Sequence, residues 1–472
     1  MKKVFFLLFT CFYSYSNAQT IHPTLDTLLS RTLDSMHNIL GNKGMGAAVQ
    51  FPGGAIWSGG TGISSENPLV EVNTQHIFNI GSVNKTITAA CILKMADDGL
   101  LSLNDSLHEW LDTFNHINPN ITIRQLLRHQ TGIYDVISHP AYQPTMGEYP
   151  DSIWTFANVI QTFISPPLFQ PGAAFSYSNT NYLLLGMIIE KVSGQPYHLE
   201  IRDRFLNPLA LSTFNMPPYE PYTQPVAHVW LNLDNDNMLD DAHDFFSNWA
   251  SWYSSVGPAG SYFSSPADIA RWMKLLMNGS LLSPATMSAM KATVNTPLGG
   301  GGTKYGLGIM ERTIFNQKAY GHGGDAGYSA SVWYFPNVDV SIAVLNNDGS
   351  KTSWTLVPTV AALLKTYLEY PGELLNSEAP ASAQLFDMCM APNPFSDHLN
   401  VSVQVPEGAS RLLLVLSDAT GKKVCETAFD CKGQSGEQQF TFDNLGQVPQ
   451  GVYFLRASVD GKWQARQQRV VK

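Results

Sequence analysis

The sequence has few charged residues and no concentration of positive charge. Asp, Glu, Lys and Arg make up 14% of its 472 residues, and 28 basic residues against 38 acidic ones give a net charge of −10. Proteins that bind nucleic acid usually carry a basic face, and no cluster of lysine and arginine offsets the acidity here. We therefore do not expect nucleic acid as a partner.

The sequence also lacks an apolar run long enough to span a bilayer. The run at residues 4–12, "VFFLLFTCF", is too short for a spanning helix. It follows Lys2 and Lys3 and precedes small residues that end at Ala18, the pattern of a secretory signal peptide. We predict that residues 1–18 are such a peptide, cleaved after Ala18.

Cysteine is scarce, with five residues. Export permits disulfides, and the four cysteines beyond the signal allow three full pairings that sequence does not rank. Cys425 and Cys431 are close enough in sequence to pair across a turn, whereas Cys91 is expected in a helix as a small buried hydrophobe. No Cys-x-x-Cys or paired-histidine spacing indicates zinc, so we expect neither a metal nor an organic cofactor.

What the sequence does contain is material for a large core, with 44% hydrophobic residues. Residues 44–60 and 327–347 each predict two strands around a turn, and 181–194 predict a buried helix that ends at Gly194. A further helix follows Ser265, with Ser265 as N-cap and Asp268 completing a capping box. Antiparallel hairpins among helices indicate a mixed α/β domain.

The composition changes after this domain. Residues 371–384 are loop-like and predict an interdomain linker. Residues 385–472 contain short strand-like runs separated by turn residues, which predict a small all-β, immunoglobulin-like sandwich.

Ser82 and Lys85 form a Ser-x-x-Lys pattern at the start of the predicted helix "GSVNKTITAACILKMADDG". Positions i and i+3 share a helix face, so the hydroxyl and the amine can meet. The helix N-terminus and burial both lower the pKa of a lysine, so Lys85 can act as a neutral base toward Ser82. The spacing alone is weak evidence, because Ser288 and Lys291 share it where we expect an ordinary surface helix.

Two more motifs follow in order, Tyr177-Ser178-Asn179 and His322-Gly323-Gly324. The ordered set resembles the serine hydrolases related to class C β-lactamases, D-alanyl-D-alanine carboxypeptidases and their esterase and D-aminopeptidase relatives. Connecting segments such as "LLRHQTGIYD" resemble the same family, over about residues 25–370. The resemblance implies a β-lactamase/transpeptidase-like mixed α/β fold, with an antiparallel sheet flanked by helices and a helical subdomain.

By this resemblance, Ser82 is the acylated nucleophile and Lys85 its proton acceptor. Tyr177 relays a proton between Ser82 and the leaving group, and Asn179 positions the substrate or Lys85. Closely coupled groups titrate as a unit, so the sequence does not assign separate protons to Tyr177 and Lys85.

The third motif bears on the substrate. The resemblance implies that His322, Gly323 and Gly324 contact it and that the backbone N–H groups of Ser82 and Asp325 form an oxyanion hole. The carboxylate of Asp325 is a departure from the family pattern. True β-lactamases of this family have Lys-Thr-Gly at this motif. Here Gly323 replaces the threonine and has no hydroxyl, and His322 replaces the lysine, whose ammonium binds a carboxylate more strongly than a neutral imidazole does. We therefore expect a D-amino-acid peptide or a small acyl ester as substrate rather than a β-lactam.

An acidic stretch, "LDNDNMLDDAHDFF", raises the question of calcium. In a loop of the EF-hand type starting at Asp234, Leu239 would stand where glycine is needed, so the pattern fails. We expect a solvated loop.

The C-terminal segments "APNPFSDHLNVSV", "GVYFLRASVDGK" and "RQQRVVK" resemble the sorting domain of type IX secretion substrates. This implies handling by the type IX machinery and transport through the periplasm to the cell surface or extracellular space. The alternative is an appended β-sandwich that binds glycan or protein.

The sequence thus predicts an exported serine hydrolase of carboxypeptidase or esterase type. The alternative is a catalytically silent surface protein that binds peptidoglycan fragments or a protein partner.

Overall fold

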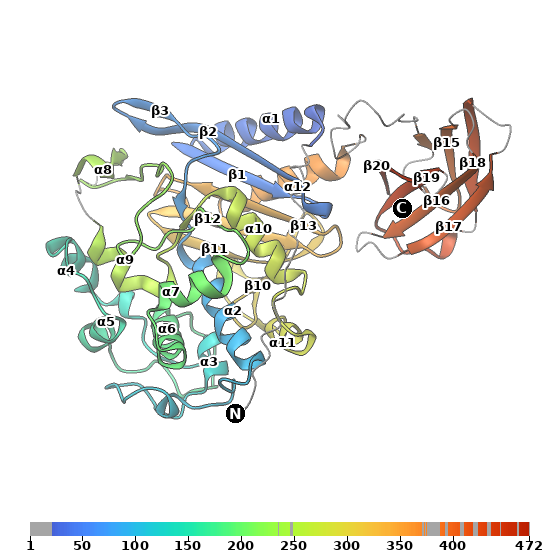
Figure 1. The fold of residues 1–472 in the computed structure, drawn as a ribbon. Helices are drawn as coiled ribbons and strands as arrows, with labels where there is room; N and C mark the ends of the chain where they lie inside the picture. Colours follow the sequence, from blue (N-terminus) through green and yellow to red (C-terminus); the bar gives the residue numbers. More distant parts are fainter. Residues whose placement is uncertain are drawn as a thin grey trace, which may run out of the picture.

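The computed structural model (Figure 1) describes residues 21–234, 236–245, 249–370, 372, 374, 388–391, 395–405, 410–418, 423–431, 436–443, 445–459 and 462–471. The predicted signal peptide and most of the predicted linker lie outside these residues. No helix in the described ranges combines the length and the apolarity needed to cross a bilayer.

A large antiparallel sheet forms the centre of the fold (Figure 1). The strand order among the described residues is β3-β2-β1-β13-β12-β11-β10-β9-β8. The strands are β1 Gly44–Gln50, β2 Ile56–Glu66, β3 Leu69–Glu71, β8 Val294–Asn295, β9 Lys304–Tyr305, β10 Met310–Ile314, β11 Gln317–Ala326, β12 Tyr328–Phe335 and β13 Val340–Asn346. Strand β1 pairs with β13, so an early hairpin closes onto the last one. Both predicted hairpins are confirmed.

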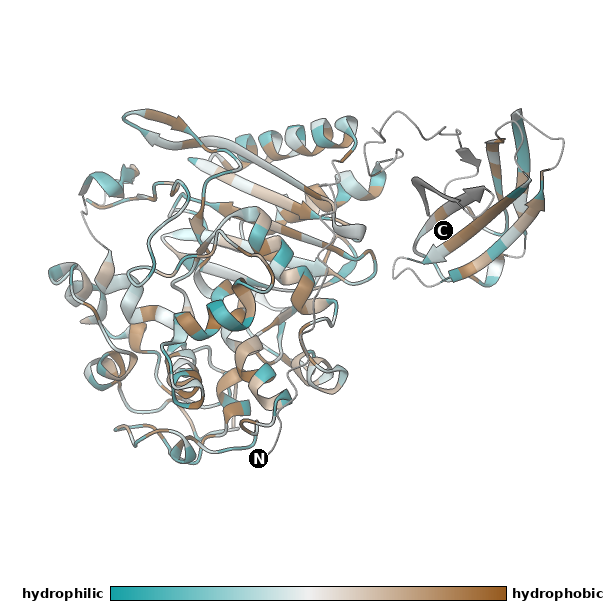
Figure 2. Cartoon of the chain, in the orientation of Figure 1, coloured by the Kyte–Doolittle hydropathy of each residue, from teal (hydrophilic) through white to brown (hydrophobic). Residues whose placement is uncertain are grey.

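The central strands are buried on both faces. Successive residues of a strand point to opposite faces, and Met45 of β1 packs into one core while Ala48 packs into the other. Helices α1 (Pro23–Leu40) and α12 (Val357–Glu369) cover the first face, and α10 (Pro266–Met277) covers the second. Figure 2 shows brown, hydrophobic residues along these strands, whereas α1 carries both teal and brown residues.

Most of the regular secondary structure between β3 and β8 is helical. They contain α2 Asn84–Asp97, α3 Ile123–Leu127, α4 Tyr142–Glu148, α5 Phe156–Phe163, α6 Asn179–Ser193, α7 Tyr197–Ile201, α8 Ala242–Phe245, α9 Ala250–Val256 and α11 Pro284–Met290, with short strand pairs β4 (Phe78–Asn79) with β7 (Phe263–Ser264) and β5 (Trp230–Leu231) with β6 (Asp240–Asp241). Helix α6 ends as predicted at Gly194, whose φ of 74° suits glycine.

The capping box predicted for α10 is only half formed. The Ser265 hydroxyl accepts a hydrogen bond from the Asp268 N–H at 3.2 Å, as an N-cap should. The Asp268 carboxylate does not accept the second hydrogen bond of the box, from the Ser265 N–H. It accepts instead from the backbone N–H and the hydroxyl of Thr213, at 2.9 and 2.8 Å. A tertiary contact therefore replaces the local one.

The C-terminal strands form two small antiparallel sheets, β14-β15-β18 and β17-β16-β19-β20. Their bounds are β14 Met388–Ala391, β15 Leu399–Val405, β16 Arg411–Asp418, β17 Lys423–Asp430, β18 Gly436–Phe442, β19 Val452–Val459 and β20 Lys462–Val471. The thiol of Cys425 is free, so a disulfide to Cys431 does not form. The reason is geometric: the extended strand β17 carries the chain away from Cys425 before Cys431 is reached. The side chain of Cys389 is not among those that the structure describes.

Candidate active site

Ser82 and Lys85 meet at the N-terminal end of α2. Ser82 lies in the single 3₁₀ turn η2 (Gly81–Val83) that leads into the helix, and the Lys85 Nζ lies 3.0 Å from the Ser82 Oγ. Lys85 is fully buried, whereas Ser82 is partly exposed. The hydroxyl is thus accessible to a substrate while the amine behind it is shielded from water.

Two further acceptors fix the position of the Lys85 side-chain nitrogen. Its Nζ lies 2.7 Å from the Asn179 Oδ1 and 2.8 Å from the Ala259 carbonyl oxygen. Burial lowers the pKa of Lys85 from 10.5 to about 7. In the neutral amine, two N–H bonds satisfy these two acceptors, so the nitrogen lone pair is directed at the Ser82 hydroxyl.

Asp135 orients Asn179. Its two carboxylate oxygens accept from the Asn179 backbone N–H at 3.1 Å and from the side-chain Nδ2 at 3.0 Å. Because the amide nitrogen is held by Asp135, the amide oxygen must face Lys85. Burial raises the pKa of Asp135, and the charge of its carboxylate raises the pKa of Lys85 against the effect of burial.

The Ala259 carbonyl is fixed from the opposite side. Ala259 is the last residue of the 3₁₀ turn η6 (Gly257–Ala259). The carbonyl of the preceding residue, Pro258, accepts hydrogen bonds from the Thr88 hydroxyl at 2.7 Å and from the Asn84 side-chain amide at 3.1 Å. Both donors belong to α2, the helix that carries Lys85. The acceptor and the amine are therefore held by the same helix.

Tyr177 lies beside this pair with a buried hydroxyl oxygen that makes no hydrogen bond of normal geometry among the described residues. Burial raises the pKa of Tyr177 well above 10, and the neighbouring Ser82 hydroxyl lowers it. The Lys85 Nζ lies 4.9 Å from the centre of the Tyr177 ring. Tyr177 is therefore a neutral phenol, able to donate a proton near Ser82 but unable to start as a base.

A hydrogen-bonded chain runs from His129 to His322 behind Tyr177. The Ser178 N–H donates to the His129 Nδ1 at 3.2 Å, so the proton of this neutral ring is on Nε2 and is donated to the Tyr305 hydroxyl at 3.3 Å. Tyr305 in turn donates to the His322 Nε2 at 3.0 Å, and the His322 Nδ1 donates to the Gly323 carbonyl. Burial lowers the pKa of His129 well below its usual value and that of His322 to about 3, so both rings are neutral.

The backbone of the third motif approaches Ser82 closely. A Cβ on Gly324 would lie 2.1 Å from the Ile80 carbonyl oxygen and 2.8 Å from the Ser82 nitrogen. A Cβ on Gly81 would lie 2.8 Å from the Asp325 nitrogen. Two glycines thus allow strand β11 to bring the Asp325 backbone next to that of Ser82, the pair expected for an oxyanion hole.

The Asp325 side chain is engaged by another residue. Its carboxylate accepts from the Ser353 N–H at 2.6 Å and from the Ser353 hydroxyl at 2.8 Å. Burial raises the pKa of Asp325, and these two hydrogen bonds lower it. The Asp325 carboxylate, which departs from the family pattern, is therefore directed toward Ser353 by two hydrogen bonds.

The second Ser-x-x-Lys copy has none of these partners. Ser288 is exposed, and the Lys291 Nζ donates to the Met277 carbonyl at 3.3 Å rather than to Ser288. The same spacing produces a surface feature here, as expected.

Four contributors to the site were not predicted from sequence: Asp135, the Ala259 carbonyl, His129 and Tyr305. His129 and Asp135 both lie within "LLRHQTGIYD", so that segment carried a usable signal. Ala259 and Tyr305 also lie within connecting segments that resemble the same family, "GPAGSYFSSPADIARWMKLLMNG" and "YGLGIM", but the sequence does not tell which of their atoms contribute to the site.

The chain is similar to known proteins in two separate regions. Residues 30–364 match the β-lactamase family, and residues 390–472 match the secretion system C-terminal sorting domain. A solved D-stereospecific amidohydrolase from Streptomyces sp. is 28% identical with a TM-score of 0.61, over 69% of this chain and 94% of that one.

Curated relatives are similar at the same level. Protein flp of Staphylococcus aureus (strain MW2) is 28% identical over 54% of this chain and 48% of its own length. Penicillin-binding protein 4 of Amycolatopsis lactamdurans is 26% identical over 66% of this chain and 82% of its own. The chain thus spans about half the length of the first of these relatives.

Proposed function

Because the chain belongs to the β-lactamase family, we propose that it is an exported serine hydrolase that forms an acyl-enzyme on Ser82. The observation that carries the proposal is the setting of Lys85. Its pKa of about 7 leaves a substantial neutral fraction at neutral pH, and Asn179 and Ala259 orient that amine toward Ser82. A poised base beside a partly exposed hydroxyl is what nucleophilic catalysis requires.

The proposed reaction follows from these contacts. Neutral Lys85 takes the Ser82 proton as Oγ attacks the substrate carbonyl carbon, and the carbonyl electron pair moves onto oxygen. The backbone N–H groups of Ser82 and Asp325 stabilise that oxyanion. The bond to the leaving group then breaks, and the proton held by Lys85 reaches the leaving group by way of Tyr177. Water hydrolyses the ester on Ser82 by the reverse proton path.

The substrate class is proposed from the third motif and from the relatives. His322 is fully buried and neutral, with both ring nitrogens already hydrogen bonded, so it offers no positive charge to a substrate carboxylate. This argues against a dedicated β-lactamase. The similarity to a D-stereospecific amidohydrolase supports D-amino-acid peptides or amides, with small acyl esters as the second class. The roles of His322, Gly323 and Gly324 in substrate contact stay predictions.

The sorting-domain match supports export to the cell surface or extracellular space by the type IX machinery. We place the hydrolase domain at residues 25–370, the linker at 371–384 and an immunoglobulin-like sorting sandwich at 385–472. The alternative of a catalytically silent binding protein has less support. Burial of Lys85 costs stability, and a protein without catalytic activity would have no need for a buried lysine.

Intact-protein mass spectrometry tests the proposal. The folded protein is exposed separately to a penicillin, an activated ester and a fluorophosphonate, with Ser82→Ala and, as matched control, Ser288→Ala. We expect one adduct that Ser82→Ala abolishes and Ser288→Ala retains, and an ester adduct that clears with time. No adduct from any reagent would contradict the hydrolase and favour the binding protein.

A further inference from the structure

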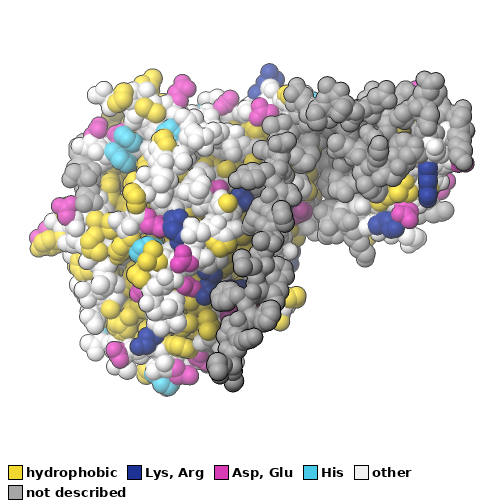
Figure 3. All heavy atoms as spheres, in the orientation of Figure 1, with side chains coloured by type: hydrophobic (Ala, Val, Ile, Leu, Met, Phe, Trp, Pro, Cys, Tyr) yellow, Lys and Arg dark blue, Asp and Glu magenta, His cyan; other side chains and the backbone are white. Residues whose placement is uncertain are grey.

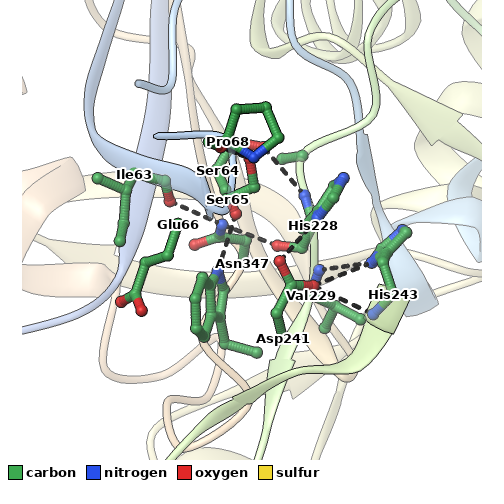
Figure 4. A network of polar contacts seen from close by, with 12 residues as sticks. Ile63, Ser64, Ser65, Glu66, Pro68, His228, Val229, Asp241, His243 and Asn347 are labelled. Carbon is green, nitrogen blue, oxygen red and sulfur yellow. Dashed lines mark hydrogen bonds and ion pairs between the residues drawn. The ribbon is translucent and has the colours of Figure 1, made fainter. Parts of the chain in front are cut away.

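Two histidines and an aspartate gather outside the candidate active site, in the β5–β6 region (Figure 4). His228 donates from Nδ1 to the Asp241 Oδ2 at 2.8 Å, and the His243 Nδ1 lies 3.8 Å from the Asp241 Oδ1. The two imidazole rings stack with their centres 4.2 Å apart. Figure 4 shows the Asp241 carboxylate to one side of the two rings, joined to His228 by a hydrogen bond.

We propose that His228, Asp241 and His243 bind a divalent transition-metal ion of the zinc class. One donor atom from each residue lies within 4.8 Å of the other two. Donors around tetrahedral zinc lie about 2.0–2.2 Å from the ion, so they are separated by about 3.3–3.6 Å. The two rings stack nearly parallel here, so the histidine side chains must turn until each presents a nitrogen lone pair to the ion. Two imidazoles and one carboxylate suit zinc and its neighbours rather than calcium, which prefers six or more oxygen ligands.

The backbone of one ligand is rigidly held. The His228 backbone N–H donates to the Ser64 hydroxyl at 3.1 Å, and its carbonyl accepts from the Asn347 Nδ2 at 2.8 Å. Ser64 belongs to β2 and Asn347 directly follows β13, so His228 is fixed to the large sheet. The backbone of His228 is therefore held in place, while its ring is free to turn toward an ion.

The other two ligands come from a smaller unit. Asp241 ends the two-residue strand β6, and His243 lies in the single-turn helix α8. The His243 Nδ1 accepts from the Val229 N–H at 3.3 Å, a long contact that an ion bound at Nδ1 would replace. The ion would thus fasten the β6–α8 segment to the sheet through His228.

The cluster is open to solvent on one side. The side chains of His228 and His243 are 34% and 27% exposed, whereas Asp241 is 9% exposed. Histidine side chains, cyan, reach the surface close to α8 on the face shown in Figure 3. An ion can therefore enter, and three protein ligands leave one position for water. The sequence does not show the cluster, because His228 and His243 are too far apart for a zinc-binding spacing and meet only in the folded chain, where β5 pairs with β6 and the Val229 N–H donates to the His243 Nδ1.

Zinc binding by the untagged protein tests the proposal, with native mass spectrometry for stoichiometry and competition with a chromophoric chelator for affinity. We expect one Zn²⁺ per chain, at least about 100-fold weaker binding in His243→Ala and in Asp241→Asn, and unchanged binding in the control His198→Ala. Circular dichroism of each variant verifies folding, and labelling of Ser82 continues in all of them.

Three outcomes would overturn the proposal. The first is no zinc retained by the folded protein. The second is equal affinity in the wild type and in folded His243→Ala. The third is a stoichiometry that falls in Cys425→Ser but not in Asp241→Asn, which would assign the ion to a thiol.

Discussion

Burial of Lys85 should lower the free energy of unfolding by an amount that depends on pH and can be measured. The pKa of Lys85 falls from 10.5 to about 7 on folding, because the folded protein removes its amine from water. Between these pH values the unfolded chain binds more protons than the folded one, so stability rises with pH. At about 1.4 kcal/mol for each pKa unit, the lowered pKa of buried Lys85 reduces the free energy of unfolding by about 4 kcal/mol at pH 7 relative to high pH. About 2 kcal/mol of this is recovered by about pH 9.

The comparison is between the wild type and Lys85→Met, by urea denaturation at several pH values from about 7 to about 9. Methionine leaves the Asn179 and Ala259 oxygens without their donor, but that loss does not depend on pH. All other titrating groups are common to both proteins. We therefore expect the wild type to gain about 2 kcal/mol over Lys85→Met across this range. Parallel pH dependences would refute the argument that Lys85 is neutralised by burial.

Three further predictions concern its neighbours. Asp135→Asn removes the carboxylate that orients Asn179, and we expect kcat/KM for an activated ester to fall about 10–100-fold. Tyr305→Phe interrupts the buried histidine chain and should lower the free energy of unfolding by about 1–3 kcal/mol in denaturant titration, with Ser82 still labelled. Gly324→Ala places a methyl group against the backbone before Ser82; the acylation rate should fall about 10²–10³-fold, and an unchanged rate would argue against the proposed oxyanion hole.

Local patterns carried much of the fold. Strand-like runs on either side of turns at Pro52 and Pro336 predicted both hairpins, and glycine at position 194 predicted the end of α6, since each depends on neighbours in the sequence. The contact of Ser82 with Lys85 is local in the same sense, because the two residues are three positions apart, a spacing that brings them to one helix face.

Contacts between distant segments escaped prediction. Ala259 reaches Lys85 directly and Asp135 acts on it through Asn179, both by the packing of α2, α6 and η6, and no local spacing encodes that packing. Asp268 illustrates the same limit. The sequence motif predicted a capping box, but the Asp268 carboxylate accepts a hydrogen bond from Thr213, a residue remote in sequence.

The central claim is that neutral Lys85 activates Ser82, and the pH dependence of fluorophosphonate labelling at Ser82 tests it most directly. We predict a second-order rate constant that rises with pH, levels off in mildly alkaline solution and has a midpoint near pH 7. A rate that is independent of pH, or one that still rises toward pH 10 as an ordinary lysine would require, would contradict the account.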